Sequence, residues 1–211
     1  TGFREPEAVL ILVATGDAIT SQQILFCRDK DIEREIWDGF RYGPEAAREV
    51  FGFDAAYSIA RLDELAGELL ADQPAVFHAF GHDTSWDQRV VGWISRVREQ
   101  VRKGVSAPAE IRDIRHLLDE MRLIKDENEL AVMREAAGIS AEAHKRAMQA
   151  TRPGRYEYEI EAELLYEFRR QGAEAPAYTS IVAGGANACV LHYIQNDAQL
   201  QAGDLLLIDA A

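Results

Sequence analysis

The chain has 211 residues, of which 47% are hydrophobic and 28% charged, and its formal net charge is -13. This length fits one large domain or two small ones with a real hydrophobic core. The negative charge argues against nucleic acid or an anionic membrane surface as a partner, because both attract proteins through a positive field. The longest purely apolar run, residues 8–14, is far too short to cross a bilayer.

The cysteine count and the first residues bear on the compartment. Cys27 and Cys189 allow one disulfide but neither a disulfide framework nor a CxxC metal site. The opening residues have neither the basic start nor the apolar stretch of a signal peptide, and there is no initiating Met. We therefore expect a cytoplasmic protein with reduced thiols.

The first half alternates strand and helix patterns. Residues 8–14 form an apolar run typical of a strand covered on both faces, and residues 23–27 are its expected partner after a turn that begins at Thr15-Gly16-Asp17. Residues 75–80 predict another buried strand. Helices are predicted at 31–37, with Asp31 as the N-cap, and at 44–50, 61–71 and 85–102. This alternation predicts a sheet with helices packed on its faces.

A join between two domains is predicted at residues 105–125, because Ser106-Ala107-Pro108 interrupts the pattern. An extended stretch at 111–114 and a helix at 116–124 are expected inside it.

The second half begins with a predicted capping box, Asp126 and Glu129, which opens a long helix ending near residue 150. A second helix is predicted at residues 157–170, with its glutamates at 157, 159, 161 and 163 mostly on a solvated face. The residues expected to turn inward are Leu130, Met133, Ala137, Ala141, His144 and Met148 in the first helix, and Ile160, Leu164, Leu165 and Phe168 in the second.

Three strands are then predicted, at residues 178–182, 188–193 and 205–208, with turns at Gly184-Gly185 and Gly203-Asp204. A core strand at the very end of a chain leaves its sheet without the next partner. Packing alone therefore leads us to expect a truncated chain.

Two residues near the end are candidates for chemistry. Asp209 follows the apolar strand 205–208, where a carboxylate is rigidly held and readily exposed, which suits hard cations such as Mn²⁺, Mg²⁺ or Ca²⁺. Capping of the following turn is the more ordinary role for such an Asp. His192, in a predicted strand, is on the residues alone more typical of a hydrogen-bonded structural histidine than of a catalyst.

An ordered set of short motifs shifts both interpretations. The set is Glu5-Pro6-Glu7-Ala8-Val9-Leu10, Glu35-Ile36-Trp37, Glu120-Met121-Arg122-Leu123-Ile124-Lys125, Leu191-His192-Tyr193, and Gly203-Asp204 through Ile208-Asp209-Ala210. In this order it resembles the landmarks of bacterial aminopeptidase P, the Xaa-Pro aminopeptidase family. The resemblance begins inside that family's N-terminal domain and stops early in its catalytic domain, so it implies that a leading segment and a later part are missing.

The resemblance implies an α/β fold in two parts. Residues 1–122, linker included, would form an N-terminal mixed-sheet α/β domain of the creatinase/prolidase type. Residues 123–211 would form the first part of an α+β pita-bread catalytic domain. It implies a metallopeptidase that releases the N-terminal residue from peptides with proline in second position. Its cofactors would be two divalent metal ions, usually manganese. A homodimer or homotetramer is expected. The chain by itself is expected to be inactive.

The resemblance also assigns roles to four residues. Asp209 matches the first of five metal ligands, and the other four (an Asp, a His and two Glu) would lie beyond Ala211. His192 matches a histidine that contacts substrate and helps to stabilise the tetrahedral intermediate. Trp37 matches a tryptophan that lines the proline pocket of a neighbouring subunit. Arg102 matches a substrate-gating arginine of the family, although the sequence around Arg102 diverges from that of the family. The family commonly has Gly where this chain has Ala211, so a backbone needing positive φ there would be strained.

Three alternatives stay open. A prolidase would act only on dipeptides. A creatinase-type amidinohydrolase shares the fold and keeps a histidine at this place without metal, although Asp209 argues against it. A non-catalytic pita-bread module would bind peptides or proteins without cleaving them.

Overall fold

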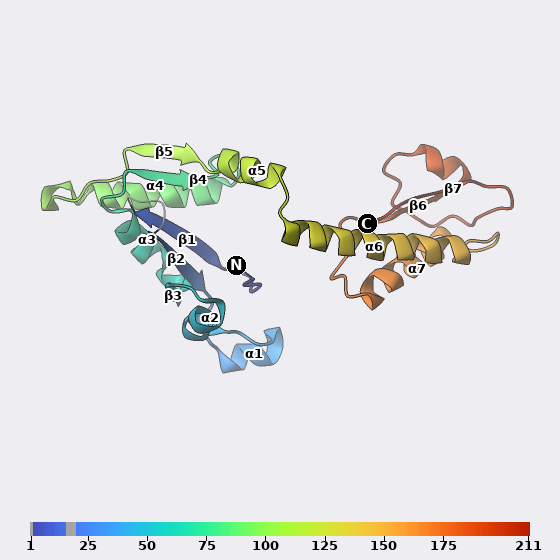
Figure 1. Ribbon diagram of the computed structural model, residues 1–211, viewed down its shortest axis with the longest axis horizontal. Helices are drawn as coiled ribbons and strands as arrows, with labels where there is room; N and C mark the ends of the chain where they lie inside the picture. Colours follow the sequence, from blue (N-terminus) through green and yellow to red (C-terminus); the bar gives the residue numbers. More distant parts are fainter. Residues whose placement is uncertain (1, 16–19) are drawn as a thin grey trace. The chain divides into compact units, whose positions relative to one another are not determined.

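The computed structural model describes residues 2–15 and 20–211, and the chain divides into two compact units between Met121 and Arg122 (Figure 1). Gly16 and Asp17 of the predicted first turn lie outside the described residues. Both units combine helices and strands, as the α/β prediction requires.

The first unit contains a three-stranded sheet with β2 (Thr20–Cys27) at its centre. β1 (Val9–Thr15) pairs with β2 in the antiparallel direction, and β3 (Ala55–Ser58) pairs with it in parallel. A parallel pair needs a crossover, which α1 (Ile32–Asp38) and α2 (Gly43–Phe51) provide. The Asp31 side chain caps α1 by accepting from the Arg34 amide at 3.0 Å, as predicted.

β1 departs from the prediction of a strand covered on both faces. Leu10 and Leu12 are 37% and 63% exposed, whereas Ile11 and Val13 are half-buried against the core. Successive side chains of a strand point to opposite faces, so only one face of β1 is covered here. An unbroken apolar run carries no period-two signal, and it could not distinguish one covered face from two.

The rest of the first unit begins with a short turn, η1 (Ile59–Arg61), and α3 (Leu62–Leu70). β4 (Ala75–His78) pairs in parallel with β5 (Glu110–Asp113). Between them lie α4 (Thr84–Arg98) and η2 (Val101–Lys103), and α5 (Arg115–Leu123) runs across the boundary at Met121. Phe77 is 45% exposed, so β4 is only partly buried and not the buried strand that was predicted.

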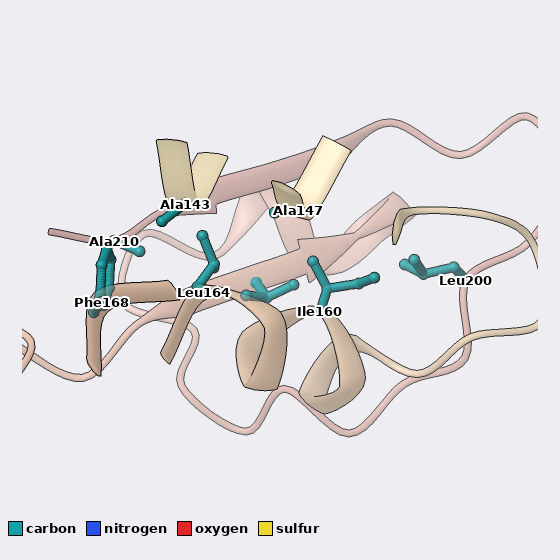
Figure 2. Close-up of a cluster of buried hydrophobic side chains, with 8 residues drawn as sticks. Ala143, Ala147, Ile160, Leu164, Phe168, Leu200 and Ala210 are labelled. Atoms are coloured by element: carbon teal, nitrogen blue, oxygen red, sulfur yellow. The ribbon is translucent and has the colours of Figure 1, made fainter. Parts of the chain in front are cut away.

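The second unit packs two helices against an antiparallel pair of strands. α6 (Glu127–Ala150) begins with the predicted capping box of Asp126 and Glu129, and α7 (Glu157–Arg170) follows it. β6 (Ile181–Gly184) and β7 (Leu206–Asp209) are antiparallel. Figure 2 shows the core between these elements, formed by Ala143, Ala147, Ile160, Leu164, Phe168, Val182, Leu200 and Ala210.

The predicted buried stripe of α6 is wrong. Met133 and Met148 are 53% and 66% exposed, and the fully buried residues are Ala143 and Ala147, on another face of the helix. Apolar residues occur on several faces of α6, so their spacing alone did not select the contact face. The helix instead turns its small side chains inward, where α7 packs closely against it.

The strand predicted at residues 188–193 does not form. Gly184 ends β6 and leads directly into the 3₁₀ turn η3 (Gly185–Cys189), so Gly184-Gly185 is not a hairpin turn. Val190 and Leu191 follow in a turn and are 53% and 88% exposed. Their apolar side chains led to the prediction of a strand. In the structure, hydrogen bonds near residues 184 and 198 determine the backbone conformation of this stretch.

No helix within the described ranges has the length and apolar character needed to cross a membrane. Both cysteines are free; Cys27 is buried and Cys189 is exposed.

The corrected contact face of α6 leads to a test by mutation. Leu164→Ala should lower the free energy of unfolding by about 2–5 kcal/mol, because it opens a cavity in the core of the second unit. Met148→Ala, in the predicted stripe but exposed, should change it by less than about 0.5 kcal/mol. Urea unfolding measures both. A large loss in the Met148 variant would restore the predicted stripe.

Candidate functional site

Asp209 is the last residue of β7, opposite Ile181 of β6. Its side chain is exposed, and its Oδ1 atom accepts a hydrogen bond from the hydroxyl of Tyr178. This bond to a carboxylate raises the pKa of Tyr178, so the hydroxyl stays a donor at neutral pH. The strand and Tyr178 together hold one carboxylate oxygen, and the carboxylate faces solvent.

Such a carboxylate fits a hard divalent cation, which prefers oxygen ligands. Among residues 2–15 and 20–211, no three or more His, Cys, Asp or Glu side chains gather in a way that could hold a metal ion. Within the described residues, Asp209 is therefore not part of a cluster of three or more candidate metal ligands.

His192 lies in the turn that follows η3, not in the strand predicted for it, and its side chain is exposed. It belongs to the same unit as Asp209. The two are linked through the sheet, because β6 pairs with β7 and then continues through η3 towards His192.

Trp37 and Arg102 lie on separate elements of the first unit. Trp37 is on α1 and is 84% exposed. Arg102 is in η2 and is also exposed. Both side chains are thus available for contacts outside their unit.

A buried carboxylate, Glu157, controls the segment that carries His192. Glu157 is 0% exposed, although it is the first residue of α7. Its Oε1 atom accepts from the Gly184 amide at 2.7 Å and from Asn187 Nδ2 at 3.1 Å. Its Oε2 atom accepts from the Tyr193 hydroxyl at 2.7 Å and from the Ala198 amide at 2.9 Å. We call residues 184–198 the His192 segment; Glu157 binds it near both of its ends.

Asn196 forms a second brace on the same segment. It is 1% exposed, and its Oδ1 accepts from the Val182 amide at 2.9 Å. Its Nδ2 donates to the Ser180 carbonyl at 2.8 Å and to Glu161 Oε2 at 2.9 Å. Asn196 has φ of 49°, a conformation that Asn adopts more readily than most residues. Glu157 and Glu161, one turn apart on α7, therefore both bind the His192 segment.

The protonation states of this cluster follow from its hydrogen bonds. Burial alone would raise the pKa of Glu157, but bonds from Gly184, Ala198, Tyr193 and Asn187 outweigh it and lower that pKa. Burial, and then the bond to Glu157, raise the pKa of Tyr193 to about 12. At neutral pH Glu157 is ionised and accepts only, while Tyr193 remains a donor.

The solvated face predicted for the α7 glutamates is therefore wrong. Glu159, Glu161 and Glu163 are partly buried, and Glu157 is fully buried. The signal was present in the spacing: Glu157 precedes Ile160 by three residues and Leu164 by seven, which places it on the buried face of a helix. A glutamate on an apolar stripe indicates a buried hydrogen-bond acceptor.

Two other features of the structure do not add to this site. A cavity of about 640 Å³ in the first unit lies between β1, α3, β4 and α4, and it is lined mainly by apolar side chains. None of Trp37, Arg102, His192 and Asp209 lines it.

Among the described non-glycine residues, positive φ occurs only at Glu7, Asp72 and Asn196, so Ala211 carries no strain of that kind.

Each unit matches a known family model over most of its length. Residues 1–77 match the model described as aminopeptidase P, N-terminal domain, and residues 131–211 match the model described as metallopeptidase family M24. The Xaa-Pro aminopeptidase of Escherichia coli is 42% identical over 210 residues, covering 100% of this chain and 47% of that protein. The chain thus spans about half the length of the curated relatives it matches.

Solved structures agree with the sequence comparison. Proline aminopeptidase P II from Yersinia pestis has a TM-score of 0.94 at 46% identity, over 100% of this chain and 48% of that one. Zinc-substituted E. coli aminopeptidase P in complex with product has a TM-score of 0.95 at 42% identity over the same shares. The fold of this chain is therefore that of the corresponding half of aminopeptidase P structures.

The lowered pKa of Glu157 predicts a pH-dependent contribution to stability. A carboxyl whose pKa is lower in the folded state stabilises the fold above its unfolded pKa of about 4.3, and this contribution is lost as pH falls through the folded pKa. Glu157→Gln should therefore be much less stable than the wild type near pH 7, with the gap narrowing below about pH 4.3. Urea unfolding across this range measures the gap. The exposed control Glu142→Gln should follow the wild type, and a Glu157→Gln gap that stays constant with pH would contradict the prediction.

Proposed function

We propose that this chain, which belongs to the aminopeptidase P family of metallopeptidases, supplies part of the active site of a metal-dependent aminopeptidase. The enzyme would release the N-terminal residue from peptides with proline in second position. The observation that carries the proposal is the exposed carboxylate of Asp209, fixed at the end of β7 by Tyr178. Because the chain spans about half of its relatives, the activity is proposed for the complete protein.

The substrate class explains why a dedicated enzyme is needed. A peptide bond to proline has no N–H, and the ring crowds its nitrogen, so proteases that recognise an extended backbone through that N–H fit it poorly. Two bound divalent ions, manganese in our proposal, would supply an ionised water near neutral pH. Asp209 would hold such an ion, since a carboxylate oxygen suits manganese. The remaining ligands would come from residues outside this chain.

His192 would act on the other side of the reaction. Its imidazole is exposed, and an N–H of the ring can donate to the oxygen that gains negative charge as the tetrahedral intermediate forms. Donors of this kind contribute about 2.7–4 kcal/mol to the lowering of a barrier. Arg102, exposed on η2, would gate entry of the peptide.

Trp37 would line the proline pocket of a neighbouring subunit, in a homodimer or homotetramer. Support comes from α1 and the turn after it, which expose an apolar group of side chains: Ile32, Ile36, Trp37 and Phe40. Exposed apolar patches of this kind are typical of contact surfaces between proteins. The two free thiols fit a reducing compartment, and we propose the cytoplasm.

The test uses the complete protein with manganese and an Arg-Pro-Pro peptide. Asp209→Asn should lower kcat/KM by at least about 100-fold and reduce bound manganese, because it removes a charged ligand from the metal site. His192→Ala should lower kcat about 100-fold with manganese retained, because it removes only the donor.

Asp119→Asn, an exposed change on α5, serves as the control and should leave both readouts unchanged. Full activity in the Asp209 variant would remove the metal role of that residue. Cleavage confined to dipeptides would identify a prolidase instead.

A further inference from the structure

We propose that Glu157 is a positioning residue for His192: its carboxylate closes the His192 segment near both ends and so determines where the imidazole stands. The inference rests on the proposed function, because His192 acquires its catalytic role there. Glu157 itself is buried beneath the segment and touches no substrate in this proposal.

The two oxygens of Glu157 divide the segment between them. Oε1 accepts hydrogen bonds from the Gly184 amide and the Asn187 side chain, in the part of the segment before His192, which we call the entering arm. Oε2 accepts from the Tyr193 hydroxyl and the Ala198 amide, in the part after His192, which we call the returning arm. His192 lies between the two arms and directly precedes Tyr193, so its backbone is attached to a side chain that the carboxylate holds.

The surroundings of Glu157 are shaped for this contact. A Cβ atom at Gly184 would lie 2.6 Å from Leu200 Cδ2, so a larger residue there would displace the Leu200 side chain, and it would meet Glu157 Oε1 at an ordinary contact distance of 3.5 Å. Asn187 Nδ2 also contacts the Tyr193 hydroxyl at 3.0 Å, which joins the two arms directly. The backbone continues the connection, because the Glu157 amide donates to the Ala198 carbonyl at 3.0 Å.

The chemistry of the site requires a carboxylate. Four donors converge on two oxygens, and an ionised carboxylate has acceptor capacity for all of them and no hydrogen of its own. An amide at this place has one oxygen acceptor and would turn its N–H groups towards one pair of donors. The Glu157→Gln change therefore keeps the shape of the side chain but loosens one of the two arms.

Few other contacts hold the residues around His192. Val190, Leu191 and Ile194 are 53%, 88% and 54% exposed, so packing holds this stretch only through Tyr193, which lies buried against Ile181 and Ala183. Asn196 braces the returning arm further along, through Val182, Ser180 and Glu161. The hydroxyl of Tyr193 is thus the anchor nearest in sequence to His192, and it binds Glu157.

The experiment is a double-mutant cycle in the complete, manganese-loaded protein, with Arg-Pro-Pro as substrate. The variants are Glu157→Gln, His192→Ala, their combination, and Glu142→Gln as an exposed control that also removes one carboxylate. Glu157→Gln should lower kcat about 10- to 100-fold, because a misplacement near 1 Å has effects of this size. KM and bound manganese should stay within about twofold, and the control should match the wild type.

The combined variant separates positioning from general damage. If Glu157 acts through His192, adding Glu157→Gln to His192→Ala should lower kcat by less than about twofold further. An equal further loss in both backgrounds would overturn the proposal, as would an unchanged kcat in Glu157→Gln. An unchanged kcat in His192→Ala would overturn the role of His192 in the proposed function and this inference with it. A loss in His192→Ala without one in Glu157→Gln overturns the inference alone.

Two further measurements keep the test decisive. In metal-free protein with isotope-labelled histidine, the His192 imidazole signal should shift or broaden in Glu157→Gln and stay in place in Glu142→Gln; an unmoved signal contradicts the proposal. Should Glu157→Gln fail to fold, Tyr193→Phe removes one of the four donors and keeps the ring. The same cycle with that variant should give a smaller loss of kcat that disappears in the His192→Ala background, and a loss of equal size in both backgrounds overturns the proposal.

Discussion

The second unit depends on a negative charge held away from water. An unpaired buried carboxylate is costly, and it is tolerated only where hydrogen-bond donors replace the lost solvation. Glu157 meets this condition with four donors taken from β6, from η3 and from the returning chain. The donors are as dependent on the carboxylate as it is on them, because the Gly184 and Ala198 amides would otherwise lie unsatisfied beside the core. This mutual dependence gives a long irregular segment a single path.

The core supplies the rigid support for that arrangement. Ala143 and Ala147 present little volume, so α7 packs closely against α6 and carries Ile160, Leu164 and Phe168 into the same cluster (Figure 2). The cluster also includes Val182 of β6 and Ala210, which directly follows Asp209. The carboxylate expected to meet a metal ion therefore stands next to a fully packed residue, and the histidine expected to meet the substrate stands on a segment braced from α7. Ligand and donor are supported by different means in one unit.

Local sequence signals, such as helix caps and apolar spacing, predicted much of this fold. The caps at Asp31 and Asp126 and the inward residues of α7 depend on near neighbours only, and the structure bears them out. The errors arose where distant partners decide. Residues 188–193 have strand-like side chains, but hydrogen bonds to α7 hold that region as a turn. The predicted buried stripe of α6 was wrong because the helix packs through its small side chains, Ala143 and Ala147, which the spacing of the larger apolar residues does not indicate. The place of Glu157 could have been found from its spacing to Ile160 and Leu164, whereas its four partners could not, since they come from residues 27 to 41 positions away.

The exposed outer face of β1 has a consequence for handling the protein. Within the described residues β1 pairs with β2 along one edge only, and Leu10 and Leu12 face away from the core. An edge strand with free N–H and C=O groups and apolar side chains is a template for joining other chains, and natural proteins guard such edges with charges, prolines or a covering element. None of the residues from Val9 to Ala14 is charged or a proline. This edge borders the cavity between β1 and β4, so another strand can pair with it only by entering that cavity, and a lysine at Leu12 would oppose such pairing.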